Sequence, residues 1–151
     1  MADLPGAVLF ACNFNRVRSA MAEALMKRAF GFSVYVDSCG LRPQDENEPA
    51  DPFVEAVMAE LGVEIGQHRS KTFDDLRDGS FDVVISLTPE THHHAVELAR
   101  NRAIAVEYWP TQDPTQQEGS REARLAAYRE VRDGLSRRIL ERFGGTATGS
   151  G

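Results

Sequence analysis

The chain has 151 residues and a formal net charge of −6 at pH 7. Its length suits one domain with its own core. No apolar run approaches the roughly 20 residues of a membrane-spanning helix, and the N-terminus lacks a signal-peptide pattern. The acidic balance argues against nucleic acid as a partner. Two cysteines favour a reducing cytoplasm over a disulfide scaffold.

Apolar runs and helix signals alternate along the chain. Strands are predicted at residues 7–11, 33–37, 81–87 and 104–109. Helices are predicted at residues 20–29, 52–61, 89–100 and 121–139. This alternation predicts an α/β fold: a single three-layer domain with a four-stranded parallel sheet, helices on both faces, and ligands at the carboxyl ends of the strands. The domain is expected to cover residues 1–143, followed by a disordered, low-complexity tail at residues 144–151.

The segment between the first strand and the first helix carries the strongest chemical signal. Cys12 is followed by five residues, then by Arg18 and Ser19. The backbone N–H groups of such a loop, with the helix N-terminus, converge on a phosphate-like dianion. Arg18 adds a planar fork for two oxygens, and the same positive field favours the thiolate form of Cys12. The predicted phosphate-binding residues are Asn13, Phe14, Asn15, Arg16, Val17, Arg18 and Ser19.

Two loop residues suit special tasks. Asn15 tolerates the left-handed backbone conformation that a loop folded around an anion requires. The Ser19 hydroxyl is placed either to cap the helix or to donate to the thiolate.

Asp113 follows the last predicted strand, so the fold brings it to the same sheet edge as Cys12. In the predicted reaction, the Cys12 thiolate attacks phosphorus and forms a cysteinyl-phosphate. Arg18 stabilises the charge on the equatorial oxygens, while Asp113 protonates the leaving group and then activates water. An ionised Asp113 would repel the dianion, so activity is expected on the acid side of neutral.

The run from Val8 to Cys12, with Asn15, Arg18-Ser19 and residues 21–24, resembles the low-molecular-weight protein tyrosine phosphatases. The thioredoxin-type arsenate reductases share that fold and loop. The stretch Trp109-Pro-Thr-Gln-Asp113-Pro114 resembles the general-acid loop of the family, and the likeness runs to about Phe143.

This resemblance implies hydrolysis of phosphate monoesters, with phosphotyrosine on proteins as the expected substrate. It also implies that Ser38 and His68 support the loop through Asn15. No cofactor or metal is expected. The partners are a phosphorylated protein or a small phosphate ester, with no nucleic acid and no membrane, and the chain is expected to be a monomer or weak dimer.

The chain departs from the family pattern around the pocket. Phe14 replaces a small residue, Arg16 an aliphatic residue, Val17 a cysteine that pairs with the nucleophile, and Thr115 an aromatic residue. These changes weaken the case for phosphotyrosine. Two alternatives stay open: Phe14 or Trp109 rebuilds an aromatic wall, or Arg16 favours an acidic substrate.

Arsenate reduction is the main rival function, and it needs a second thiol to attack the cysteine adduct. Residues 86–92, where thioredoxin-linked relatives carry such cysteines, contain none. Strand alternation sends Cys39 to the opposite face from Ser38, which favours a structural Cys39. A reductase that uses an external thiol stays open, as does a phosphate-binding module without turnover.

The three histidines at 92–94 invite a metal hypothesis. Neighbouring residues on a helix point about 100° apart, so three in a row do not converge on one ion. A solvated or partly packed start of a helix is the preferred interpretation.

Overall fold

The structure is a computed structural model that describes residues 4–42, 48–76 and 80–144. Within these residues one sheet contains four parallel strands in the order β2-β1-β3-β4. The strands are β1 Ala7–Cys12, β2 Tyr35–Gly40, β3 Val83–Ser86 and β4 Ala105–Tyr108. The predicted four-stranded parallel sheet is confirmed. Because β1 lies in the centre, the loop that follows it leaves the sheet between two neighbouring strand ends.

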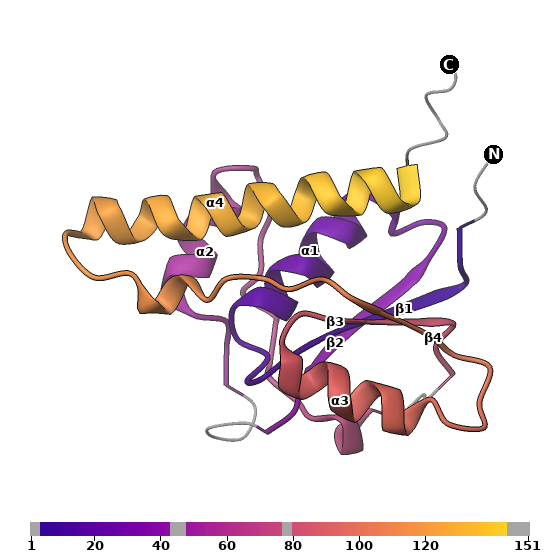
Figure 1. Ribbon diagram of the computed structural model, residues 1–151. Helices are drawn as coiled ribbons and strands as arrows, with labels where there is room; N and C mark the ends of the chain where they lie inside the picture. Colours follow the sequence, from indigo (N-terminus) through magenta and orange to yellow (C-terminus); the bar gives the residue numbers. More distant parts are fainter. Residues whose placement is uncertain (1–3, 43–47, 77–79, 145–151) are drawn as a thin grey trace.

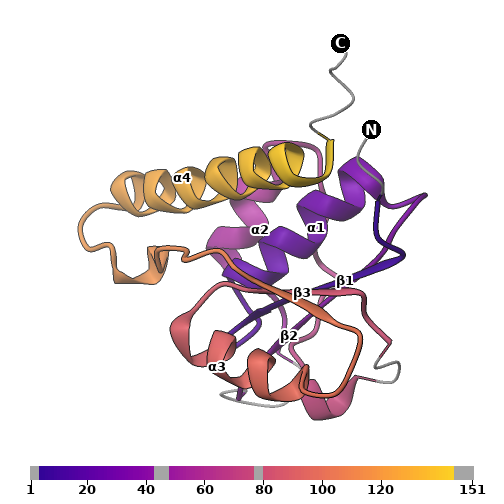
Figure 2. The ribbon, with the colours of Figure 1, turned by 45° about the vertical axis from the view of Figure 1, so that its right-hand side comes forward.

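Helices cover both faces of this sheet, as predicted. Three of them lie on one face: α1 Arg18–Phe30, α2 Pro52–Ala59 and α4 Arg121–Ile139. Helix α3, Pro89–Leu98, lies on the other face, below the sheet in Figure 1 and Figure 2. Short helical turns complete the described chain: η1 Phe73–Asp75, η2 Pro114–Gln116 and η3 Leu140–Gly144.

Alternation along β1 divides the core into two clusters. Val8, Phe10 and Cys12 belong to the larger cluster, beneath α1, α2 and α4. Leu9 and Ala11 belong to the smaller cluster, on the side of α3. Each of these five side chains is at most 2% exposed, so both faces of β1 are sealed from water.

The predicted starts of α2, α3 and α4 are confirmed by their caps, whereas α1 begins at Arg18, two residues before its predicted start, without a side-chain cap. The Asp51 carboxylate accepts a hydrogen bond from the Phe53 N–H at 2.8 Å, ahead of Pro52 in the first turn of α2. The Thr88 and Ser120 hydroxyls cap α3 and α4 in the same way. Helix α2 ends at Ala59, a turn earlier than its predicted stop at Gly62.

The second strand lies later in the chain than predicted. Residues 33–37 were the predicted strand, whereas β2 spans Tyr35–Gly40. The N–H groups of Ser33 and Val34 both donate to the Phe30 carbonyl, so these two residues close the end of α1 instead. As a result Ser38 lies within β2, opposite Phe10, and not at its end.

Two further expectations concern the tail at residues 144–151 and membrane-spanning helices. Gly144, the first residue of the predicted tail, is the last residue of η3, and residues 145–151 lie outside the described residues. Across the described ranges, no helix has both the length and the apolar character needed to cross a bilayer.

Candidate active site

The loop between β1 and α1 turns its carbonyl groups outward. The groups that accept from surrounding segments are Cys12 O from Leu41 N (3.0 Å), Asn13 O from Arg42 N (3.0 Å), Asn15 O from His68 Nε2 (2.7 Å), Arg16 O from Asp51 N (3.1 Å) and Val17 O from Met21 N (3.0 Å). No acceptor for the backbone N–H groups of residues 13–17 lies among the described residues. Carbonyls tied down on the outside leave these N–H groups to line the inside of the loop, which is the arrangement that binds anions.

Close packing against Gly40 holds the start of this loop. A Cβ atom at Gly40 would lie 2.9 Å from the Asn13 carbonyl oxygen and 2.9 Å from the Phe14 carbonyl carbon. Both neighbours are backbone atoms that cannot rotate away. A glycine is therefore needed at the end of β2 for the loop to pass.

Asn15 is the structural centre of the loop. Its backbone has φ = 61°, the left-handed conformation predicted for it, and its side chain is fully buried. Its amide Nδ2 donates to Ser19 Oγ at 2.8 Å and to Ser38 Oγ at 2.9 Å, while Oδ1 accepts from the Lys71 N–H at 3.0 Å. One side chain therefore joins the loop to α1, to β2 and to the segment before η1.

The Cys12 sulfur lies against two donors of Ser19. Its Sγ is 2.9 Å from Ser19 Oγ and 3.4 Å from the Ser19 N–H nitrogen. Ser19 Oγ accepts from Asn15, and its own hydrogen has two acceptors in reach, the sulfur at 2.9 Å and the Cys39 carbonyl at 3.4 Å, of which the sulfur is the nearer. Val17, not Ser19, is the N-cap of α1, so the alternative in which Ser19 caps the helix is wrong. Two donors at one sulfur stabilise a thiolate.

His68 supports the loop from behind, where the family resemblance placed it. Its Nε2 donates to the Asn15 carbonyl, and its Nδ1 lies 4.0 Å from a Glu23 carboxylate oxygen. Burial lowers the pKa of His68, and the hydrogen bond to Asn15 only partly opposes this. His68 is therefore a neutral donor near pH 7.

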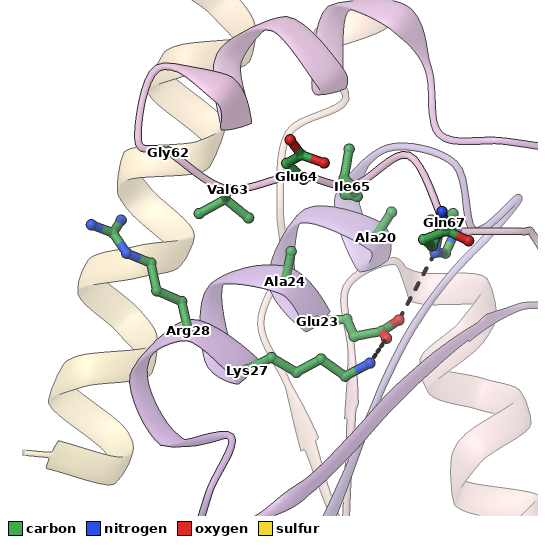
Figure 3. A pocket seen from close by; sticks show the side chains of 11 residues that line it. Ala20, Glu23, Ala24, Lys27, Arg28, Gly62, Val63, Glu64, Ile65 and Gln67 are labelled. Carbon is green, nitrogen blue, oxygen red and sulfur yellow. Dashed lines mark hydrogen bonds and ion pairs between the residues drawn. The ribbon is translucent and has the colours of Figure 1, made fainter.

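Glu23 is a supporting residue to which sequence analysis gave no role. Its carboxylate accepts from the Ser38 hydroxyl and pairs with Lys27. Figure 3 shows Glu23 and Lys27 side by side in a groove between α1 and residues 62–68. Glu23 is four residues after Ser19, so both lie on one face of α1. The four-residue spacing between Ser19 and Glu23 was the sequence signal that could have identified Glu23.

Arg18 and Asp113 meet at the mouth of the loop. Arg18 Nη2 lies 3.9 Å from Asp113 Oδ2, and Arg18 Nη1 donates to the Thr111 carbonyl at 2.9 Å. The other Asp113 oxygen accepts from Thr115, from its N–H at 3.0 Å and its hydroxyl at 2.7 Å. Burial raises the pKa of Asp113, but the Thr115 hydrogen bonds and the Arg18 charge outweigh it, so the pKa is lowered. The ionised form of Asp113 is thus favoured near pH 7.

Six of the predicted site residues line one cavity of about 350 Å³, whereas Asn13, Asn15 and Ser19 of the predicted phosphate-binding loop are not part of its lining. Its lining comprises Cys12, Phe14, Arg16, Val17, Arg18, Asp51, Asp113, Thr115 and Gln116. Phe14, 36% exposed, is the aromatic side chain of this lining. Trp109 does not form a wall, contrary to one expectation. It is 3% exposed and packs edge-on against Phe10, because the end of β4 delivers it into the core.

Arg16 is already engaged by its own chain. Its Nε donates to the Pro49 carbonyl at 2.9 Å and lies 3.8 Å from a Glu48 carboxylate oxygen. The charge of Arg16 is therefore largely balanced by Glu48. This weakens the hypothesis that Arg16 selects acidic substrates.

A second missed contact holds the loop from the other side. The Thr88 hydroxyl, at the N-cap of α3, donates to Asn13 Oδ1 at 2.8 Å. The two residues are 75 apart in the chain, so no local pattern could have joined them. Loop residues 13 and 15 are thus fixed from opposite sides of the sheet.

His92 and His94 have separate partners. His92 Nδ1 is 3.0 Å from Ser86 Oγ, and its ring stacks on Tyr108. His94 packs on Phe73. Across residues 4–42, 48–76 and 80–144, no group of three or more His, Cys, Asp or Glu side chains is arranged to hold a metal ion.

Comparisons with known proteins agree with this geometry. The family model for "Low molecular weight phosphotyrosine protein phosphatase" matches residues 7–141. An arsenate reductase of Halalkalibacterium halodurans is 31% identical over 132 residues, which cover 87% of this chain and 91% of that protein. A low molecular weight protein-tyrosine-phosphatase of Streptomyces coelicolor is 35% identical over 85 residues, covering 53% of this chain and 51% of that protein.

Among solved structures, an arsenate reductase in the phosphate binding state superimposes with a TM-score of 0.71 at 28% identity, covering 93% of this chain and 98% of that one. The family match spans most of the chain and includes both the Cys12 loop and Asp113. The chain belongs to the low-molecular-weight phosphotyrosine protein phosphatase family, whose fold is shared by phosphatases and arsenate reductases.

Proposed function

We propose that this enzyme hydrolyses phosphate monoesters through a phosphorylated Cys12. The loop N–H groups and Arg18 bind the dianion above the sulfur, and the Ser19 N–H and hydroxyl lie against the sulfur that attacks. The thiolate attacks phosphorus in line, and the bond to the leaving oxygen breaks. Asp113 provides the proton for that oxygen. Water, activated by the same carboxylate, then releases phosphate and regenerates the thiolate.

Asp113 must take up a proton when substrate binds. Its carboxylate faces Arg18 at 3.9 Å. A bound dianion neutralises Arg18 and places negative charge beside the carboxylate, and both changes raise the pKa of Asp113. The acid form is therefore favoured by the substrate itself.

The position of Cys39 favours hydrolysis over arsenate reduction in which a second cysteine of the same chain attacks the Cys12 adduct. Cys39, the only cysteine besides Cys12, is 0% exposed and packs with the cluster on the α3 side of the sheet. Cys12 belongs to the cluster on the other side. Burial, followed by the Cys12 charge, raises the pKa of the Cys39 thiol well above its ordinary value. Cys39 is thus a poor second nucleophile, on the opposite face of the sheet from Cys12.

The substrate we propose is phosphotyrosine on proteins, in a cytoplasm that keeps both cysteines reduced. Phe14 provides an aromatic surface beside the cavity for a phenyl ring. Both cysteines are free and buried, which suits a reducing compartment.

Arsenate reduction with an external thiol is the second candidate. It is favoured by the 31% identity to an arsenate reductase over most of both chains. In that reaction Cys12 forms a bond to arsenic and one arsenate oxygen leaves as water, and an external thiol then attacks the sulfur of the adduct. Arsenic(V) leaves as arsenic(III), while the two sulfurs are oxidised to a mixed disulfide.

A two-substrate assay separates these functions. Para-nitrophenyl phosphate hydrolysis by the wild type, lost in Cys12→Ser, is the expected result. Arsenate is supplied in parallel with glutathione, and arsenite is measured. Thiol-dependent arsenite formation with negligible ester hydrolysis would establish the reductase instead. Ester binding without either activity would show a binding module.

A further inference from the structure

Two arginines on α4 lie over an aromatic ring near the active-site cavity. Arg121 and Arg124 are exposed, and their guanidinium carbons lie 5.5 Å and 4.6 Å from the centre of the Phe53 ring. Within the described residues, neither side chain forms an ion pair or a side-chain hydrogen bond. We call Arg121, Arg124 and Phe53 the arginine patch.

Contacts lead directly from the patch to the cavity that holds Cys12. Phe53 stacks on Tyr128 at 5.1 Å between ring centres. The Tyr128 hydroxyl donates to Asp51 at 3.2 Å, and Asp51 lines the cavity. Burial and the Asp51 charge raise the pKa of Tyr128, while the charge of Arg124 opposes them, which also indicates that Arg124 lies close to this wall.

The ribbon views support this position. The N-terminal end of α4 and the segment before it, which contains η2, lie together on the left of the molecule in both Figure 1 and Figure 2, and α2 lies beneath α4 in Figure 1. Helix α2 carries Phe53, and η2 contains Thr115 and Gln116 of the cavity lining. Tyr128 contacts both Phe53 of the patch and Asp51 of the cavity lining, so one side chain separates the two.

Nearby carboxylates do not neutralise the patch. Glu122 pairs with Arg129 at 3.2 Å, and Asp51 is held by Tyr128 and by the N-terminus of α2. Glu118 is joined to neither arginine in the part of the chain that the structure describes. The patch is a local concentration of positive charge on a protein with a net charge of −6.

The geometry of the patch suits carboxylates. A guanidinium group held over an aromatic ring keeps the N–H groups at its edge free to donate, and its planar fork matches a carboxylate. We propose that Arg121 and Arg124 form a subsite for acidic side chains near the phosphorylated residue of a protein substrate. This proposal rests on the proposed phosphatase activity, and it names acidic phosphopeptides as the preferred substrates.

Phosphopeptide kinetics test this subsite. Three phosphotyrosine peptides differ only in flanking residues, which are acidic, neutral or lysine, with separate sets for the N-terminal and C-terminal sides. The wild type is expected to prefer the acidic peptide. The double variant Arg121→Ala/Arg124→Ala is expected to lower kcat/KM for that peptide about fivefold, with the neutral peptide and para-nitrophenyl phosphate within twofold of wild type. Charge reversal, Arg121→Glu/Arg124→Glu, should shift the preference to the lysine peptide.

Arg137→Glu is the matched control, since Arg137 is an exposed arginine on the same helix, 13 residues after Arg124. It should leave the peptide preference unchanged. Added salt should weaken the wild-type preference, because exposed charge contacts are screened. An acidic-to-neutral ratio that is equal in the wild type and both double variants would overturn the subsite.

Binding measurements keep this test separate from the proposed function. If the wild type hydrolyses no ester, the phosphatase proposal fails, and fluorescence anisotropy of the same labelled peptides still tests the patch. Weaker binding of only the acidic peptide by Arg121→Ala/Arg124→Ala supports the subsite. Unchanged peptide binding, with loss of adsorption to phosphatidylserine vesicles, would make the patch a membrane contact and contradict the proposal.

Discussion

Replacement of Asn15 by alanine should destabilise the protein far more than the same change at Asn101. Both residues have φ = 61°, so alanine at either site costs about 1 kcal/mol of left-handed strain. Asn15→Ala also removes the three side-chain hydrogen bonds to Ser19, Ser38 and Lys71, at about 1 kcal/mol each. The expected loss in the free energy of unfolding is about 4 kcal/mol at Asn15 and about 1 kcal/mol at Asn101, which is exposed.

Equilibrium unfolding in urea measures both values. Asn15→Gly separates the two contributions, because glycine adopts the left-handed conformation without strain. It should lose about 3 kcal/mol. A displaced loop should also lower kcat/KM of Asn15→Ala for para-nitrophenyl phosphate by about 100-fold. If Asn15→Ala and Asn101→Ala differ by less than about 1 kcal/mol, the network does not stabilise the loop and the reasoning is refuted.

Three further predictions concern residues around the loop. Thr88→Val should lower the free energy of unfolding by about 1 kcal/mol through loss of the α3 cap, and should raise KM by releasing Asn13. Thr88→Ser should restore both values. Unchanged kinetics in Thr88→Val would show that the Thr88–Asn13 contact is dispensable. Cys39→Ala should retain wild-type ester hydrolysis in the absence of any thiol, and its loss in a folded variant would reveal a redox role for Cys39. The lowered pKa of Asp113 stabilises the folded protein at pH values above the unfolded carboxyl pKa of about 3.9, and this stabilisation is lost as the pH falls through the folded pKa. Asp113→Asn should therefore be less stable than wild type at pH 7 and equally stable near pH 2. A difference that stays constant with pH would mean that this carboxylate contributes no pH-dependent stability.

Local sequence signals were sufficient for most of the fold. Asp51-Pro52 and Thr88-Pro89 mark helix starts because caps act through neighbouring residues, and both starts are confirmed. The second strand was placed too early, because Ser33 and Val34 are held by the end of α1. A strand-like composition alone does not show that Ser33 and Val34 form hydrogen bonds to the end of α1 instead of joining the strand.

The candidate site was predictable where residues act within one segment. The left-handed conformation of Asn15 and the contact between Ser19 and Cys12 both lie inside the loop. The Thr88–Asn13 contact joins residues far apart in the chain, so it emerges only from the fold. The placement of Trp109 was wrong because its position relative to Phe10 depends on how β4 ends against the core.

The balance of charge at the mouth also depended on the fold. Arg16 looked like a free cation in the sequence, yet Glu48 and the Pro49 carbonyl engage it. The sequence assigned no role to Arg121 and Arg124, and only their position over Phe53 places them on the same side of the molecule as the cavity.

The central claim is that Cys12 carries the phosphoryl group during turnover. Rapid acid quenching of the enzyme with para-nitrophenyl phosphate, followed by intact mass spectrometry and peptide mapping, tests this claim directly. One transient phosphoryl group per chain is expected, located on Cys12. It should be absent from Cys12→Ser and should form without any added thiol. Ester hydrolysis that proceeds with Cys12 unmodified, or that persists in Cys12→Ser, would contradict it.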